Sequence, residues 1–430
     1  MMLDLRFAFV LCCIAAPARA DSDDFDREPI NYKTARPDNA VSKLQGRLDA
    51  GKTKLAIAED GGFLPAVLKR LDIPHSSQIL VFSKTSFQRD RISPKTPRAI
   101  YFNDDTYVGF CLRGDVLEVS AADAKLGTVF YTLDQDSTAK PAFVRQRDNC
   151  LTCHASAATG GVPGHLVRSV FTDRTGLPIL SAGSLRTDHT SPISQRWGGW
   201  YVTGEHGKQM HRGNWIVENA KDPEAEGNAG GQNVTELKSR FTVANYLTPH
   251  SDIVALLVFE HQTGCHNRIA QAMISTRQAR HYEASLNREF DEAAGKRWDS
   301  AVRRIDAAAE DLVRHLLFCG EAKLEGPIAG TAGFAREFAA RGPFDKRGRS
   351  LREFDLKSRV FKYPCSFLVH SEAFAGLPSE VKDIALKRMH EVLTGKDLSE
   401  AFAHLAAADR KAVLEILRDT LPDLPDYWKK

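Results

Sequence analysis

Residues 251–259 read Ser-Asp-Ile-Val-Ala-Leu-Leu-Val-Phe, and this stretch decides the fold. Ser251 belongs to the residue types that cap helix N-termini, and the residues from Ile253 to Phe259 are all apolar. A helix that is apolar on every side is expected inside a protein rather than on its surface. We therefore predict a buried helix that begins near Ser251 and continues to about Arg280.

The chain after this stretch has the pattern of a helical region. Charged amphipathic segments follow it, and each ends at helix-stopping residues. These segments lie at about 284–318, at 379–393 and at 406–418. Between the first two, residues 320–349 form a Gly-rich connection. We predict a mainly helical region over residues 250–430.

The chain before the stretch is rich in strands. After one helix predicted over 63–71, runs of β-branched and aromatic residues alternate with turn residues. The runs lie at 79–82, 99–102 and 128–131. Further along, 167–171 and 177–180 flank the turn residues 172–176 and predict a hairpin. The predicted class is α+β, with a strand-rich N-terminal part over 21–145, a middle region over 146–249 and the helical C-terminal part.

The composition is that of a soluble globular protein. The chain has 430 residues, of which 43% are apolar, and a formal net charge of +3. At roughly 100–200 residues per domain this length allows two or three domains, which excludes disorder and a small disulfide scaffold. The charge is far from the basic excess of nucleic-acid-binding proteins, so no nucleic-acid partner is expected.

The first twenty residues resemble a secretory signal peptide. A charged start with Arg6 precedes an apolar stretch from Phe7 to Ala16, and small residues stand at Ala18 and Ala20. We expect cleavage after Ala20 and a periplasmic or secreted product. No later apolar stretch has the length of a membrane-spanning helix, so no membrane span is expected.

One short motif carries the visible chemistry of the chain. Cys150-Leu151-Thr152-Cys153-His154 has the spacing of a c-type haem attachment site. Two thiols three residues apart lie one helical turn apart and can reach the two vinyl groups of a porphyrin. The next residue, His154, then lies beneath the ring, where its imidazole can bind the iron. No second Cys pair or His pair with zinc-site spacing accompanies the motif.

With the export signal, Cys150, Cys153 and His154 make the chain resemble the c-type cytochromes, over five residues of 430. The segments 160–164 and 196–201 are similar to those of large exported proteins with one such motif. The resemblance implies one covalent haem c, His154 as the proximal iron ligand and electron transfer in the periplasm. The 146–249 region is then the haem-attachment region.

The sixth iron ligand decides between electron transfer and chemistry on a bound ligand. Seven of the fourteen histidines follow the motif within about 110 residues: His165, His189, His206, His211, His250, His261 and His266. His206 follows an aromatic, Gly-containing segment, and His261 follows the apolar turns of the buried helix. We rank these two first as candidate distal ligands, Met210 next, and an open or water-bound site after them.

Four further cysteines remain in the mature chain. Cys111, Cys265, Cys319 and Cys365 either form two disulfides in an oxidising compartment or stay buried and free. Cys265 and Cys319, both on predicted helices, are the favoured pair if one forms.

The sequence thus predicts an exported monohaem c-type cytochrome that exchanges electrons with a redox partner protein or a small donor or acceptor. Two alternatives stay open: a haem-dependent periplasmic oxidoreductase acting on a small substrate, and a haem-bearing sensor or scaffold subunit. The length favours the alternatives over a pure carrier, because about a hundred residues are enough to hold one haem. Whether the protein is an enzyme is left open by the sequence.

Overall fold

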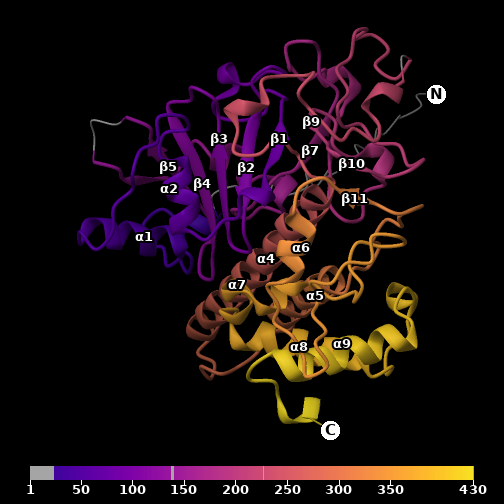
Figure 1. Ribbon diagram of the computed structural model, residues 1–430. Helices are drawn as coiled ribbons and strands as arrows, with labels where there is room; N and C mark the ends of the chain where they lie inside the picture. Colours follow the sequence, from indigo (N-terminus) through magenta and orange to yellow (C-terminus); the bar gives the residue numbers. More distant parts are fainter. Residues whose placement is uncertain (1–23, 137–139, 226, 430) are drawn as a thin grey trace, which may run out of the picture.

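The computed structural model describes residues 24–136, 140–225 and 227–429. The predicted signal peptide at 1–20 lies outside these residues. Within them the predicted α+β class is confirmed: an antiparallel sheet occupies the N-terminal half, and helices make up most of the C-terminal part (Figure 1). The described helices include none that is long and apolar enough to cross a membrane.

The sheet has seven strands in the order β6-β5-β4-β3-β2-β1-β9, and all neighbouring strands are antiparallel. Their bounds are β1 (Ile79–Val81), β2 (Arg98–Phe102), β3 (Thr106–Phe110), β4 (Val116–Asp123), β5 (Gly127–Asp134), β6 (Phe143–Gln146) and β9 (Trp200–Tyr201). The three runs predicted as strands are β1, β2 and part of β5. The last strand, β9, comes from the predicted middle region, so that region shares its sheet with the N-terminal part.

Successive side chains of each strand point to opposite faces of the sheet, and each face has its own cover. On one face, Tyr131 of β5 hydrogen-bonds Asn39, which caps helix α1 (Ala40–Asp49). On the other face, Tyr107 of β3 hydrogen-bonds His266 of helix α4 (Ile253–Glu289). Phe102 of β2 also packs on α4, with its ring centroid 5.4 Å from that of Phe259. The long helix therefore lies directly against the sheet.

Helix α4 is buried at its start, as the sequence predicts, but its ends differ from the prediction. Its N-cap is Asp252, whose carboxylate accepts hydrogen bonds from the backbone N–H groups of Val254 and Ala255. Ser251 does not cap the helix, because its hydroxyl donates to the carbonyl of Tyr201 at 2.6 Å. The helix also runs past Arg280 to Glu289, and it takes up the first residues of the segment predicted at 284–318.

The described residues form seven further α-helices. They are α2 (Leu64–Arg70), the one-turn α3 (Leu151–His154), α5 (Asp299–Leu316), α6 (Phe334–Ala339), α7 (Glu372–Ala375), α8 (Ser379–Leu393) and α9 (Ala407–Thr420). Helix α5 packs on both α4 and α8, and α9 packs on α8. The helices predicted over 63–71, 379–393 and 406–418 are confirmed to within two residues at each end.

The predicted hairpin is only partly right. β7 (Arg168–Val170) pairs with β8 (Ser184–Arg186) rather than with 177–180. Residues 177–180 meet the first arm through a single bridge between Thr172 and Pro178. The turn is tightened by Gly176, which has a φ of +86° and lies so close to Phe82 that a Cβ would come within 2.4 Å of its carbonyl oxygen. A second small pair joins β10 (Gly204–Glu205) to β11 (Ala329–Gly330).

Candidate functional site

The Cys-x-x-Cys-His motif forms one helical turn at the edge of the α4-covered face of the sheet. The backbone N–H of His154 donates to the carbonyl of Cys150 at 3.0 Å, so the two cysteines and His154 share a single turn. Cys153 is exposed and Cys150 is half-buried, and neither forms a disulfide. Burial raises the pKa of the Cys150 thiol to about 11, so it stays protonated at neutral pH.

His154 is held by one ring nitrogen. Its Nδ1 lies 3.0 Å from the carbonyl oxygen of Gly164, and its ring packs against Phe130 of β5 at 4.9 Å between centroids. Burial lowers the pKa of His154, which favours the neutral imidazole. In that form Nδ1–H donates to Gly164, and Nε2 keeps its lone pair with no hydrogen bond from any described residue. Metal-binding histidines are commonly held in this way, with one ring nitrogen bonded to a carbonyl and the other free.

The loop after the motif is clamped onto α4. The side-chain amide of Asn267 accepts from the backbone N–H of His165 and donates to its carbonyl, both at 2.8 Å. The ring of His165 bonds Ser120 and approaches Thr128, so this histidine is fixed between the sheet and α4. The clamp positions Gly164, and through Gly164 it orients His154.

A cavity of about 250 Å³ lies between this loop and helices α4 and α5. Thr159 and Gly160, which follow the Cys-x-x-Cys-His motif, line it, and so do Asp188 and His315. Two arginines, Arg186 and Arg268, add positive charge to its wall; the rest of the lining is Ala157, His165, Val167, Thr187, Thr263, Gly264, Asn267 and Gln271. The cavity is large enough for several waters or a small molecule.

A buried group of three histidines lies next to this cavity, whose wall includes one of them, His315. His261 of α4, His315 in the last turn of α5 and His189 in the loop after β8 each offer a ring nitrogen, and these nitrogens lie within 4.8 Å of one another. The Nδ1 atoms of His261 and His189 are 3.3 Å apart, and Nε2 of His261 lies 2.8 Å from the hydroxyl of Ser366. Among the described His, Cys, Asp and Glu residues, this triad is the group with metal-binding geometry.

The triad is kept neutral by its surroundings. Burial lowers the pKa of His189 and His261 well below the ordinary value and that of His315 to about 4. Burial acts to raise the pKa of the adjacent Asp188, but hydrogen bonds from Thr190 act against burial, and the pKa of Asp188 is lowered. Neutral imidazoles beside an ionised carboxylate are the electrostatic setting that a cation requires.

A buried ion pair fixes the loop that carries His189. Nη1 of Arg196 lies 3.1 Å from the carboxylate of Glu260, and both side chains are almost fully buried, with 2% and 0% exposed. Arg196 also donates to the carbonyls of His189 and Ser191. Glu260 precedes His261 on α4, so this arginine ties the loop to the helix next to the triad.

A second polar row joins the sheet to the other side of α4. The Tyr107 hydroxyl bonds Nδ1 of His266 at 2.9 Å and accepts from Gln262 at 2.8 Å. Nε2 of His266 lies 3.8 Å from a carboxylate oxygen of Asp105. Burial raises the pKa of Asp105 to about 7 and lowers that of His266 to about 4. The ring centroid of Tyr107 also lies 4.2 Å from that of His165, so this row extends toward the loop that follows the Cys-x-x-Cys-His motif.

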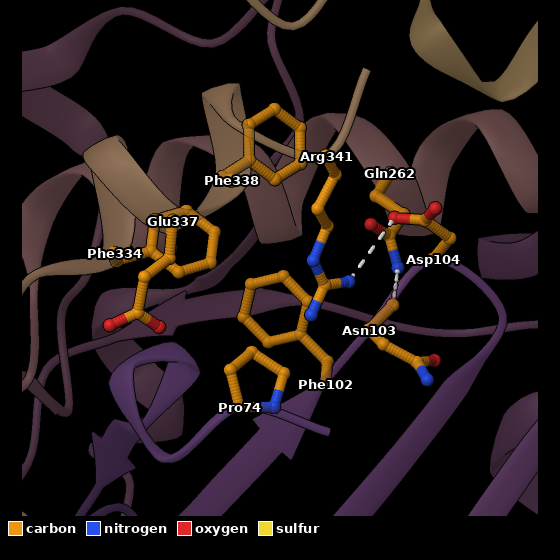
Figure 2. Close-up of a pocket in the computed structure, with 9 residues that line it drawn as sticks. All are labelled: Pro74, Phe102, Asn103, Asp104, Gln262, Phe334, Glu337, Phe338 and Arg341. Carbon is orange, nitrogen blue, oxygen red and sulfur yellow. Dashed lines mark hydrogen bonds and ion pairs between the residues drawn. The ribbon is translucent and has the colours of Figure 1, made fainter. Parts of the chain in front are cut away.

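Figure 2 shows a smaller pocket, beside Gln262 of α4. It has room for about 10 Å³ and is lined mainly by Phe102, Phe334 and Phe338. Arg341, which points toward Asp104 at 4.0 Å, lies at one side of it. A space of this size holds at most a single water, so the pocket is part of the packing around the end of β2.

The two candidate distal ligands lie in different places. His261 belongs to the triad, whereas His206 is buried beside His211, with 4.6 Å between ring centroids. Nε2 of His206 accepts from the backbone N–H of Asn233, and its Nδ1 is buried without a partner in the described part of the chain. Neither histidine makes a hydrogen bond or ring contact with His154 among the described residues. Met210, the next candidate, is exposed.

All six described cysteines are free. The favoured Cys265–Cys319 disulfide is absent from them, and Cys265 instead accepts a hydrogen bond from the Ser366 hydroxyl at 3.7 Å. Burial raises the pKa of Cys265 to about 12, which makes it an unreactive core thiol.

Sequence reasoning missed the triad as a unit. His189 and His261 stood among the seven histidines after the motif, but His315 lies on another amphipathic helix and carried no signal of its own. The four-residue histidine spacing of a helical metal pair is absent, because each ligand comes from a different element. A search with family models, curated proteins and solved structures finds no match to this chain.

Proposed function

We propose that the protein is an exported monohaem c-type redox protein, with haem joined to Cys150 and Cys153 and its iron bound by His154. The observation that carries the proposal is the bond between His154 Nδ1 and the Gly164 carbonyl, which leaves Nε2 free to bind a metal. The accessible thiols of the same turn support it. When bound, the haem would supply one-electron chemistry between ferric and ferrous iron.

In this proposal the protein matrix orients the iron ligand. Asn267 holds the loop, the Gly164 carbonyl accepts a hydrogen bond from His154 Nδ1–H, and Phe130 packs against the imidazole ring. A fixed, neutral imidazole is a stronger iron ligand than a freely rotating one, because the hydrogen bond at Nδ1 raises the basicity of Nε2.

A second candidate function is a haem-dependent oxidoreductase. The cavity of about 250 Å³ favours it, because residues Thr159 and Gly160 of the haem loop form part of its wall. Arg186 and Arg268 would attract a small anionic substrate into this space. A carrier cytochrome has no need for such a cavity.

The test is the haem content of the purified protein after denaturation. We expect one covalent haem per chain, and we expect Cys150→Ser and Cys153→Ser to lose covalent attachment. Cys319→Ser is the matched control, since Cys319 is also a half-buried free thiol. Absence of covalent haem from the native protein refutes the proposal.

The spectrum of the loaded protein then separates the two functions. A low-spin, six-coordinate haem supports electron transfer, and a high-spin haem that binds added ligands supports the oxidoreductase. His206→Ala and His261→Ala test the candidate distal ligands, because removal of a true ligand converts a low-spin spectrum to high-spin. A spectrum unchanged by either substitution eliminates that histidine.

A further inference from the structure

The histidine triad is unusual because its polar atoms are buried with few protein partners. His189 and His261 are 2% and 1% exposed and His315 is 9% exposed. Nδ1 of His189 faces Nδ1 of His261 at 3.3 Å, and among the described residues Nε2 of His315 makes a long contact of 3.4 Å to the carbonyl of His261. Buried polar atoms without partners cost about 1–3 kcal/mol each, so a cluster of them requires an explanation.

We propose that His189, His261 and His315 together bind one transition-metal ion, and that the ion keeps an open coordination position toward the cavity. The proposal goes beyond the haem function and does not depend on it, because none of the three residues belongs to the haem-attachment motif.

The spacing of the ring nitrogens matches a metal site. Metal–nitrogen bonds to histidine are about 2.0–2.1 Å long, so two imidazole nitrogens on one tetrahedral ion are about 3.3–3.4 Å apart. The Nδ1 atoms of His189 and His261 are 3.3 Å apart. The His315 ring lies 4.3 Å from that of His189 between centroids, close enough to complete the set.

The outer contacts of the triad are those of metal ligands. Nε2 of His261 faces the Ser366 hydroxyl at 2.8 Å, which orients Nδ1 toward His189. The carbonyl of His189 accepts from Arg196 at 3.0 Å and from the backbone N–H of Ala322 at 3.0 Å. The two bonds to the His189 carbonyl hold the loop that carries His189 and do not occupy the nitrogens of its ring.

The open position follows from the ligand count and the cavity. Three protein ligands with a free fourth position distinguish catalytic zinc-type sites from closed structural ones. His315 and Asp188 form part of the cavity wall, so a ligand in that space can approach the ion directly. Three imidazoles suit zinc, copper, iron and nickel, and they exclude calcium and magnesium, which prefer oxygen ligands.

The experiment measures metals in the purified full-length protein by plasma mass spectrometry, with haem iron counted separately from the haem spectrum. We expect one transition-metal ion per chain beyond haem iron. His315→Gln should lose it, whereas His390→Gln should retain it. His390 is the matched control because it is equally buried, at 9% exposed, and also lies in the last turn of its helix.

Ser366→Ala keeps all three ligands and tests the proposal where a ligand variant fails to fold. Loss of the orienting bond should weaken Zn²⁺ binding, measured by calorimetry on chelator-treated protein, by about 10–100-fold. The open position is tested by adding azide to Cu²⁺-loaded protein, whose paramagnetic resonance spectrum should change.

Three results overturn the proposal. The first is native protein without a stoichiometric metal beyond haem iron and without Zn²⁺ or Cu²⁺ binding after chelation. The second is metal retention in folded His315→Gln. The third is a His261→Gln variant whose haem spectrum changes while its metal content does not, which assigns His261 to the haem. Haem attachment is read separately in each sample, so failure of the metal site and failure of the haem proposal are distinguishable.

Discussion

Replacing Arg196 by Met should be among the most destabilising changes in this chain. Arg196 and Glu260 form an ion pair whose side chains are 2% and 0% exposed, and Arg196 also donates to two backbone carbonyls. The substitution keeps much of the side-chain volume and removes the charge and all three hydrogen bonds. Glu260 is then left as a buried carboxylate without its cation.

The expected loss can be worked from the geometry. At 3.1 Å and an effective dielectric constant of about 20, the attraction between the two charges is about 5 kcal/mol. Breaking a buried pair by removing one partner costs about 3–5 kcal/mol, and two unpaired carbonyls add about 1 kcal/mol each. Burial raises the pKa of Glu260, with Arg196 opposing the rise, so protonation of Glu260 recovers part of the cost. We expect a net loss of about 4 kcal/mol.

The assay is urea unfolding followed by circular dichroism, with a double-mutant cycle of Arg196→Met, Glu260→Gln and the combined variant. The combined variant should lose less than the sum of the two single variants, by about 3 kcal/mol, because no unpaired charge remains. A loss below about 1 kcal/mol for Arg196→Met, with an unchanged denaturant slope, refutes the claim that this pair anchors the loop. Additive single losses refute the claim that the two charges act on each other.

Three further outcomes follow from single contacts. Burial raises the pKa of Glu321 to about 7 from 4.5. Because the folded state keeps this proton while the unfolded state loses it, the free energy of unfolding should fall by up to about 3 kcal/mol as pH rises from 4.5 to 7. Glu321→Gln should abolish this part of the pH dependence in thermal melts. A profile identical to that of the native protein contradicts this. Asn267→Ala should cost about 2–4 kcal/mol in urea unfolding, since it leaves two backbone groups of His165 unpaired; a loss under about 1 kcal/mol argues against the clamp. Asp252→Ala should lower the free energy of unfolding by about 1–2 kcal/mol, because it removes the N-cap of α4. Ser251→Ala leaves the cap intact and serves as the comparison. An Asp252→Ala variant with unchanged helix content and stability refutes the assignment of the cap.

The fold was readable from the sequence where local pattern decides the structure. The apolar run 253–259 placed a buried helix, and 379–393 was predicted with the bounds that α8 has. The errors lie where tertiary contacts override local preference. Ser251 is a good capping residue by type, but its hydroxyl is used by Tyr201 of the sheet, and the cap passes to Asp252.

The same contrast between local pattern and tertiary packing holds for the candidate site. The Cys-x-x-Cys-His motif is local, because its three residues share one helical turn, and five consecutive residues are enough to find it. The triad is not local: His189 is 72 residues from His261 in sequence, and His315 is 54 residues from it. Only the packing of α5 on α4, and the Arg196 tie to the loop, bring them together.

Helix α4 connects the Cys-x-x-Cys-His motif to the histidine triad through its two sides. His261 and His266 are five residues apart, which places them about 140° apart around the helix axis, so they serve different faces. His266 bonds Tyr107 of the sheet, and Tyr107 packs on His165, which follows the Cys-x-x-Cys-His motif. His261 faces His189 and the Ser366 hydroxyl. One helix therefore separates the motif-bearing side from the side of the histidine triad and contacts both. A metal ion at the triad and a haem at the motif would be held by the same helix, with the cavity between them, and this arrangement requires both the sheet and the helical part.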